Sequence, residues 1–163
     1  MLLLMLKAQS VQEASSSSLS LIRFEANMIL EVLFMEKVWS LRLIRFSAIF
    51  GFIGTYLGSH MAGQMDYSLR PVHAHILLVG WLSVFAWGIF YHAYTIKYKK
   101  LVTIHGIFAM VGAVGLTGGM WLYNLNPFNW NETLVMVLFI VGGTLLLIAF
   151  LLFAVITFLT EKE

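Results

Sequence analysis

Four long apolar stretches, separated by short polar connections, dominate the sequence beyond residue 34. They cover residues 39–59, 71–96, 101–123 and 133–159. About 20 apolar residues in a helix cross the hydrocarbon core of a bilayer, and each stretch reaches that length. Within lipid the backbone must satisfy its own polar groups, which a helix does. The pattern therefore predicts an all-α fold, a four-helix transmembrane bundle.

Residues 1–34 do not follow this pattern. They open with an apolar run of only six residues, which Lys7 follows, and continue into a Ser-rich patch. A secretory signal has basic residues before a longer apolar core and a small-residue cleavage site. We predict a disordered or mis-started N-terminal extension, with translation beginning at Met35 and the membrane domain covering residues 35–163. An interfacial helix over residues 19–34 is the alternative.

The composition supports a protein embedded in lipid. The 163 residues are 60% hydrophobic and 11% charged, with a mean hydropathy of +0.87, whereas a soluble domain carries about 25% charged residues. The chain has no cysteine, which excludes disulfides, zinc–thiolate sites, iron–sulfur clusters and covalently attached c-type heme. Histidine and methionine remain as soft or borderline metal ligands. The formal net charge of +2 does not indicate nucleic acid as a partner.

The basic residues beyond residue 34 predict an orientation. If four helices alternate across the membrane, only Arg70 falls on one side. The other side collects Lys37, Arg42, Arg45, Lys97, Lys99, Lys100 and Lys162. The positive-inside rule places that second side, with both termini, in the cytoplasm. We therefore expect an N-in/C-in bundle.

Five histidines lie near the ends of the predicted helices, and ionisable groups at membrane depth usually have a function. His73 and His92 are 19 residues apart, roughly 28 Å along a helix axis, so they cannot bind one metal. The sequence thus offers an outer group, with His60, His73 and His75, and an inner group, with His92 and His105. Two residues turn a helix by about 200°, so the side chains of His73 and His75 point to opposite faces.

The two faces of the second helix differ below these histidines. His73 shares its face with Gly80, Trp87 and Tyr91, which provide a small residue near the imidazole and aromatic walls further on. His75 shares its face with Leu82, Ala86 and Ala93. The His73 face is therefore the better candidate for a cofactor.

Ordinary interpretations of the other histidines stay open. His60 fits a solvated loop residue, His92 fits an anchor at the membrane interface, and His105 fits a solvated residue at a helix start. No Asp or Glu lies inside a predicted span, so a carboxylate-bridged metal site has little support.

Glycines recur on the first and third predicted helices. Gly54–Gly58 and Gly115–Gly119 are pairs of small residues four positions apart, which let helices approach closely. The 3.6-residue period also puts one histidine and three small residues on one face of the third helix: His105, Ala109, Gly112 and Gly119. Helix packing alone explains this pattern. The alternative is a slot for a porphyrin.

The segment LRPVHAH at residues 69–75 resembles a motif in the catalytic subunit of heme–copper oxidases, most closely the cbb-type enzymes. There an L-R-P-aliphatic-His segment opens the second helix. The resemblance implies that His73 is an axial ligand of a low-spin heme b. Gly80-Trp81 and Gly88–Tyr91 also fit that helix. Over roughly residues 43–123 the chain is similar to short bacterial membrane proteins identified as subunit I-like, which implies a location in the bacterial inner (cytoplasmic) membrane.

The resemblance is partial. A full catalytic subunit of that family has many more than four helices. The helix that supplies its copper ligands, its cross-linked tyrosine and its high-spin heme ligand has no counterpart here. The second axial ligand of the low-spin heme comes from that helix too. We therefore do not expect this chain alone to reduce oxygen, and no catalytic residue is predicted.

Together these observations predict a membrane protein that binds heme b and serves in electron transfer or as a respiratory-chain accessory. The second axial ligand would be His60, or His73 or His75 of a second copy, because the small-residue faces favour a homo-oligomer. The candidate cofactor-binding residues are His73, His75, His60, His105, Gly80 and Gly112, of which the candidate metal ligands are His73, His75 and His60. Expected partners are the lipid bilayer, a second copy and a respiratory complex or electron-transfer protein.

Two other functions stay open. His60 and His75, with Met61 and Met65 nearby, would suit copper(I), or zinc, at the outer surface. The other possibility is a cofactor-free accessory subunit of a respiratory complex. Elemental analysis and an optical spectrum would separate the three hypotheses.

Overall fold

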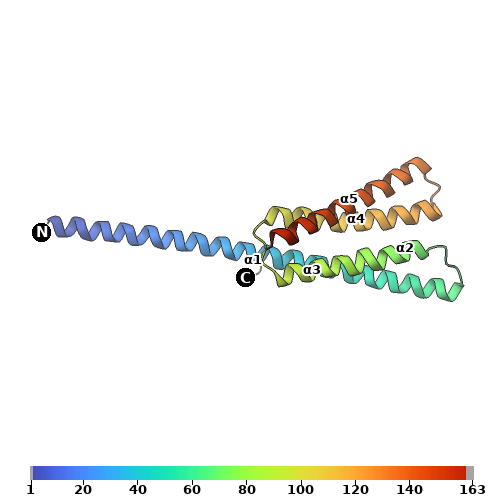
Figure 1. Cartoon of the computed structure of the whole chain (residues 1–163), viewed down its shortest axis with the longest axis horizontal. Helices are drawn as coiled ribbons and strands as arrows, with labels where there is room; N and C mark the ends of the chain where they lie inside the picture. Colours follow the sequence, from blue (N-terminus) through green and yellow to red (C-terminus); the bar gives the residue numbers. More distant parts are fainter. Residues whose placement is uncertain (1, 161–163) are drawn as a thin grey trace.

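The computed structural model describes residues 2–160, and side chains throughout from residue 37 (Figure 1). Every element in that range is helical: α1 (Leu2–Gln64), α2 (Arg70–His75), the π-helix η1 (Ile76–Ser83), α3 (Val84–Ala93), α4 (Lys99–Leu125) and α5 (Glu132–Leu159). The elements α2, η1 and α3 are continuous. The predicted bundle is confirmed, with four helices long and apolar enough to cross a membrane: Lys37–Gln64, Arg70–Ala93, Lys99–Leu125 and Glu132–Leu159.

Helix α1 extends beyond its predicted bounds at both ends. It continues to Gln64, so the first connection is only residues 65–69 and His60 lies on a helix, not in the predicted connection. It begins at Leu2 and runs without interruption through residues 2–34, for which we predicted a disordered or mis-started extension; this part of α1 projects beyond the other helices (Figure 1). The sequence has no Pro or Gly before Gly51, so no strong helix breaker interrupts this stretch. That translation begins at Met35 stays a prediction.

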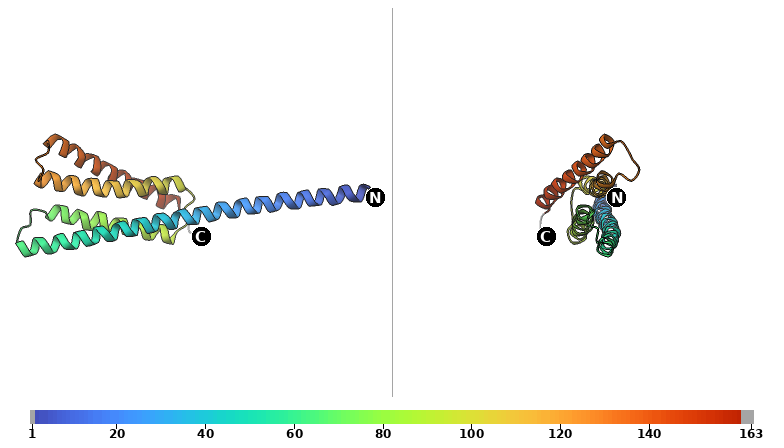
Figure 2. Two further views of the ribbon diagram at one scale, coloured as in Figure 1. Left: turned by 180° about the vertical axis from the view of Figure 1, so that it is seen from behind. Right: turned by 90° about the vertical axis from the view of Figure 1, so that its right-hand side faces the viewer.

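The spans pair as two hairpins, α1 with α2–η1–α3 and α4 with α5 (Figures 1 and 2). We call one end of the bundle the His73 end; it carries the connections 65–69 and 126–131. We call the other the lysine end; it carries the connection 94–98, the start of α4 and the end of α5. The N-terminal part of α1 leaves the bundle at the lysine end (Figure 2).

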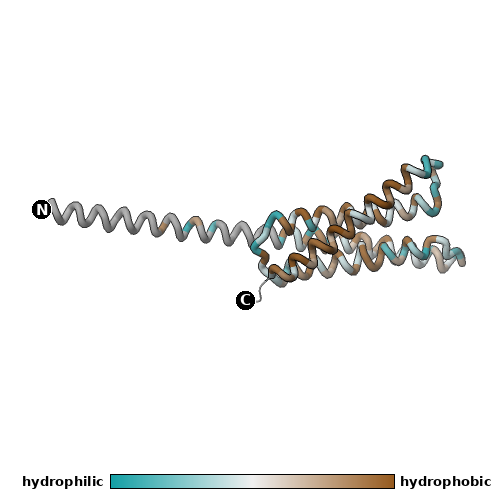
Figure 3. Tube along the Cα trace, turned by 45° about the horizontal axis from the view of Figure 1, so that its top comes forward, coloured by the Kyte–Doolittle hydropathy of each residue, from teal (hydrophilic) through white to brown (hydrophobic). Residues whose placement is uncertain are grey.

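The outward surface of the spans is apolar, and polar residues gather at the connections (Figure 3). Large side chains such as Phe52, Leu147 and Phe158 are 75%, 70% and 90% exposed. A soluble monomer rarely exposes contiguous apolar surface of this extent. This surface is what a helix bundle presents to lipid.

Glycines bring α4 and α5 into backbone contact. A Cβ atom on Gly142 would clash with the carbonyl carbon of Gly115. A Cβ on Gly112 would lie 2.6 Å from the backbone nitrogen of Leu146. Larger residues at these points would force the helices apart, which is the packing use of small residues in membranes. The space beside Gly112 is therefore filled by α5.

Buried apolar side chains form two clusters. The larger lies toward the lysine end and joins all four spans, through Trp39, Leu43, Val84, Trp87, Tyr91, Ile96, Val102, Ala109, Leu146, Ala149 and Ile156. The smaller lies toward the His73 end and consists of Phe50, Val72, Ile76 and Ala113. A polar link supplements the larger cluster, where the indole Nε1 of Trp39 donates to Thr103 Oγ1 at 3.1 Å. The candidate sites at His73 and at His105 thus lie near different apolar clusters.

Candidate functional site

His73 lies in the first turns of the second span and packs on α1. Its Nδ1 is 3.0 Å from the carbonyl oxygen of Gly54. A carbonyl only accepts hydrogen bonds, so Nδ1 carries the proton and Nε2 of the neutral ring holds a lone pair. A Cβ on Gly58 would lie 2.8 Å from His73 Cε1. The Gly54–Gly58 pair therefore seats this imidazole, and the lone pair of Nε2 is available for bonding.

His75 has the same tautomer on the opposite flank of the helix. Its Nδ1 is 2.8 Å from the carbonyl oxygen of Pro71, within its own helix. The buried stripe of this span includes Val72 and Ile76, and His73 and His75 flank it on either side. Both imidazoles are half-buried. The predicted divergence of the two side chains agrees with these separate partners, so the two rings do not converge on one ion.

His60 does not join His73. It lies on α1 two residues beyond Gly58, about 200° round the helix, and is exposed. Its ring lies beside Tyr56, with centroids 6.2 Å apart. Met61 occupies the neighbouring position and is buried, with 6% of its surface exposed. His60 therefore belongs to a different face of α1 from the one that seats His73.

The connection before His73 is held by local bonds. The carboxylate of Asp66 accepts from the backbone N–H of Ser68 at 2.9 Å, and this bond lowers the pKa of Asp66 below its usual 3.8. The guanidinium of Arg70 lies over the ring of Tyr67, 4.6 Å from its centroid. These contacts fix the entry of the chain into α2.

The π-helix η1 begins immediately after His75. The hydroxyl of Ser83 donates to the carbonyl oxygen of Leu78 at 2.9 Å, five residues back, and short π segments are often found at functional sites. Gly80 lies within η1, where a Cβ would clash with Cδ1 of Phe50. The side chain of Phe50 fills the space that the sequence offered to a cofactor beside Gly80.

His105 occupies the best-enclosed position of the five histidines. None of its surface is exposed. Its Nδ1 is 2.7 Å from the hydroxyl of Tyr91, while its Nε2 is buried without a hydrogen-bond partner. Three aromatic rings surround it, those of Trp87, Tyr91 and Phe153, at centroid distances of 4.8, 5.6 and 5.6 Å. This arrangement is a polar pair inside an aromatic core.

Trp87 and Tyr91, which we predicted as aromatic walls below His73, lie against His105 instead. Trp87 is 14 residues from His73 on one helix, roughly 21 Å along its axis. The packing of α4 against the second span brings His105 beside Trp87 and Tyr91. The Tyr91–His105 pair was not predicted from the sequence. Its signal was the spacing of two buried polar residues on either side of the connection 94–98.

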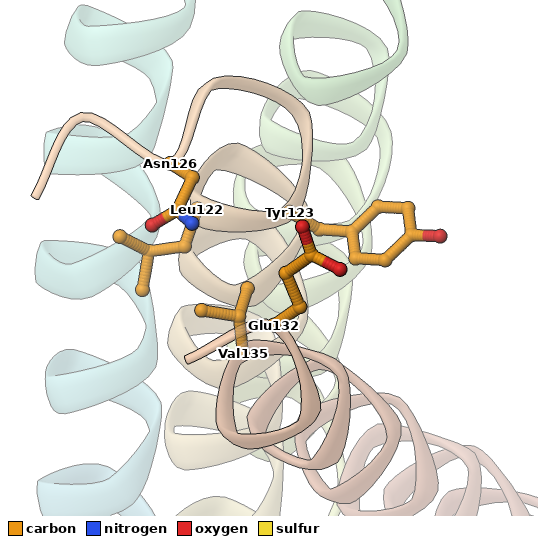
Figure 4. A pocket seen from close by; sticks show the side chains of 5 residues that line it. All are labelled: Leu122, Tyr123, Asn126, Glu132 and Val135. Atoms are coloured by element: carbon orange, nitrogen blue, oxygen red, sulfur yellow. The ribbon is translucent and has the colours of Figure 1, made fainter. Parts of the chain in front are cut away.

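The remaining predicted residues do not converge. His92 is exposed on α3. Among the described residues, no three His, Cys, Asp or Glu side chains are placed to hold a metal ion. A pocket of about 310 Å³ lies between α4 and α5 at the His73 end, lined by Leu122, Tyr123, Asn126, Glu132 and Val135 (Figure 4). It contains a carboxylate and no histidine, so it does not extend the His73 site.

No protein-family model, no curated protein and no solved structure matches the chain. The resemblance to heme–copper oxidase subunit I therefore remains an expectation that rests on the LRPVHAH segment and the residues that follow it.

Proposed function

We propose that the protein binds heme b in the membrane and transfers electrons, with His73 as one axial ligand. The observation that carries the proposal is the hydrogen bond between His73 Nδ1 and the Gly54 carbonyl oxygen. Metal-ligating histidines almost always donate their other ring N–H to a carbonyl or carboxylate, which orients the ring and raises the basicity of the ligating nitrogen. His73 has that arrangement before any cofactor is added.

The Nε2 atom of His73 is a donor that suits heme iron, and its surroundings suggest how a porphyrin would be held. Within one copy, Phe50 fills the space at Gly80 and α5 fills the space at Gly112. The porphyrin would therefore meet His73 Nε2 at the half-buried boundary of the bundle. We propose that a second copy closes the site and that its own His73 supplies the opposite ligand. His60 is a weaker choice, since it lies on another face of α1.

Heme b, when bound, supplies one-electron chemistry at its iron. The chain's contribution is to hold the His73 imidazole as the Nε2 donor and to keep the site in an apolar setting. Ligation by two imidazoles would favour electron transfer over oxygen binding.

The test is an optical spectrum of the full-length protein purified from membranes, oxidised and then reduced with dithionite. We expect a reducible b-type band that His73→Ala abolishes. His92→Ala is the matched control, because it removes an exposed imidazole from the same span. Both variants must keep the elution volume and helical circular dichroism of the wild type. An unchanged band in His73→Ala would refute the assignment.

A cofactor-free accessory subunit is the second candidate. It is favoured by the contacts at Gly80 and Gly112, because protein fills both spaces that the sequence offered to a porphyrin. A colourless, metal-free protein that co-purifies with an oxidase would select it. Copper handling is less favoured, since Met61 is buried and His60 and His75 have separate neighbours.

A further inference from the structure

The lysine end of the bundle holds a pocket that the proposed heme site does not use. Its volume is about 570 Å³. The connection 94–98 and the first turn of α4 supply its basic side chains: Lys97, Lys99 and Lys100. Helices α4 and α5 supply its apolar walls: Leu101, Ile104 and Leu159. One cavity therefore combines concentrated positive charge with apolar surface.

The two kinds of lining follow each other along the axis of α4. The lysines lie where the span begins, and Ile104 lies more than a turn deeper on α4. The side chains of Ile104 and Leu159 are each 44% exposed, so the apolar walls are open to the lipid phase. Tyr98 also lines the pocket and is 52% exposed, as expected of a ring at a membrane interface. A charged head with an apolar tail matches this order.

Charge complementarity determines the sign of the charge on the ligand's headgroup. Helix α4 begins at Lys99 with no acidic residue in its first turn and no side-chain cap. The N-terminus of a helix carries a partial positive charge, and three lysines add to it. A negative group in this pocket would be attracted by both. The chain beyond Leu159 carries Glu161 and Glu163, which lie outside the described residues.

We propose that this pocket binds an anionic phospholipid. The lysines contact its phosphate, and an acyl chain lies along Leu101, Ile104 and Leu159. Basic pockets between transmembrane helices on the cytoplasmic side hold anionic headgroups in this way. The predicted orientation puts the lysine end in the cytoplasmic leaflet. The site lies apart from His73, so it stands or falls independently of the heme.

The headgroup is tested with the full-length protein in detergent, titrated separately with dioleoylphosphatidylglycerol and dioleoylphosphatidylcholine. Native mass spectrometry counts the retained lipid. Each lysine near an anionic lipid contributes about 1 kcal/mol, or roughly fivefold in affinity. We expect the triple variant Lys97→Gln/Lys99→Gln/Lys100→Gln to lower the preference for phosphatidylglycerol by at least roughly tenfold.

The matched control is Lys37→Gln/Arg42→Gln/Arg45→Gln. It removes the same number of positive charges near the same end of the bundle, from exposed positions on α1 that do not line the pocket. The control should keep the wild-type preference. Equal losses in the two variants would show a general charge effect and overturn the proposal, as would a wild-type preference in the lysine variant.

The tail is tested with Ile104→Ser against Ile107→Ser. Both isoleucines are 44% exposed on α4, but only Ile104 lines the pocket. We expect Ile104→Ser alone to release phosphatidylglycerol more readily. Inorganic phosphate is added in a separate arm and should compete poorly. Full displacement by phosphate, or equal behaviour of the two serine variants, would refute a lipid site.

Discussion

His73 and His105 are both held by a hydrogen bond at Nδ1, yet the two imidazoles differ in burial and in the surroundings of Nε2. The Nδ1–H of His73 donates to a backbone carbonyl, and its ring is half-buried. His105 pairs with the side chain of Tyr91 and has no exposed surface. The Nε2 of His73 is open to a ligand that approaches the bundle surface, whereas that of His105 is closed in by protein. A similar bond therefore orients a half-buried ring in one place and completes a buried core in the other.

The largest expected effect comes from removing the enclosed ring. His105→Ala leaves a cavity among aromatic side chains and removes the hydrogen-bond partner of the Tyr91 hydroxyl. We therefore expect the free energy of unfolding to fall by about 2–4 kcal/mol. His73→Ala should lose less than about 1 kcal/mol, because its ring is half-buried. Unfolding in mixed detergent, followed by circular dichroism, measures both. Equal losses would remove the distinction between core and site.

The next effect isolates the hydrogen bond of the buried pair. Tyr91→Phe keeps the ring and removes the hydroxyl, which leaves both nitrogens of His105 unpaired. We expect a loss of about 1 kcal/mol in the free energy of unfolding, in the range of membrane hydrogen bonds. Tyr94→Phe is the control, since that ring is 42% exposed. A double-mutant cycle with His105→Leu should give a coupling free energy between the two side chains. Additive losses would show that the 2.7 Å contact contributes no coupling energy.

A subtler change tests the seat of His73 without touching the ligand. Gly58→Ala puts a Cβ 2.8 Å from the His73 ring, whereas Gly63→Ala on the same helix meets nothing within 4 Å. We expect Gly58→Ala to weaken heme retention by roughly tenfold, the scale seen when a group that orients a metal ligand is changed, and Gly63→Ala to leave it unchanged. Heme per protein after dilution is the measurement. Indistinguishable variants would contradict the role of the glycine pair.

The smallest effect concerns the connection that leads into His73. The carboxylate form of Asp66 accepts from Ser68, so its pKa lies below 3.8. The bond is therefore present above the ordinary Asp pKa and is lost as pH falls through the lowered value. Asp66→Ala should speed amide exchange at Ser68 at neutral pH and leave exchange within the His105 cluster unchanged. Unaltered exchange at Ser68 would show that the bond contributes nothing.

The four spans were predictable because lipid imposes one rule on every residue within it. A segment of sufficient length and apolarity becomes a helix whatever its neighbours are. The positions of Gly115 and Gly119 likewise predicted close helix contact. The end of α1 was misplaced, since His60 and Gln64 are polar enough to suggest a connection while nothing in the backbone stops the helix there.

The histidine environments were only partly predictable. A single-helix wheel placed Trp87 and Tyr91 on the face of His73, and it could not show that another helix would reach them first. The pairing of Tyr91 with His105 depends on how α3 and α4 are joined. The glycine faces were predicted as packing surface or cofactor slot, and only the neighbouring helix shows what fills the space.

The sequence by itself determined that the chain forms four apolar helices, because the cost of exposing backbone polar groups to lipid acts on each segment separately. Only the tertiary structure decided which histidine is sealed and which has a nitrogen at the surface, because burial depends on contacts between helices. Gly54, Gly58 and Tyr91 acquire their roles from those contacts alone.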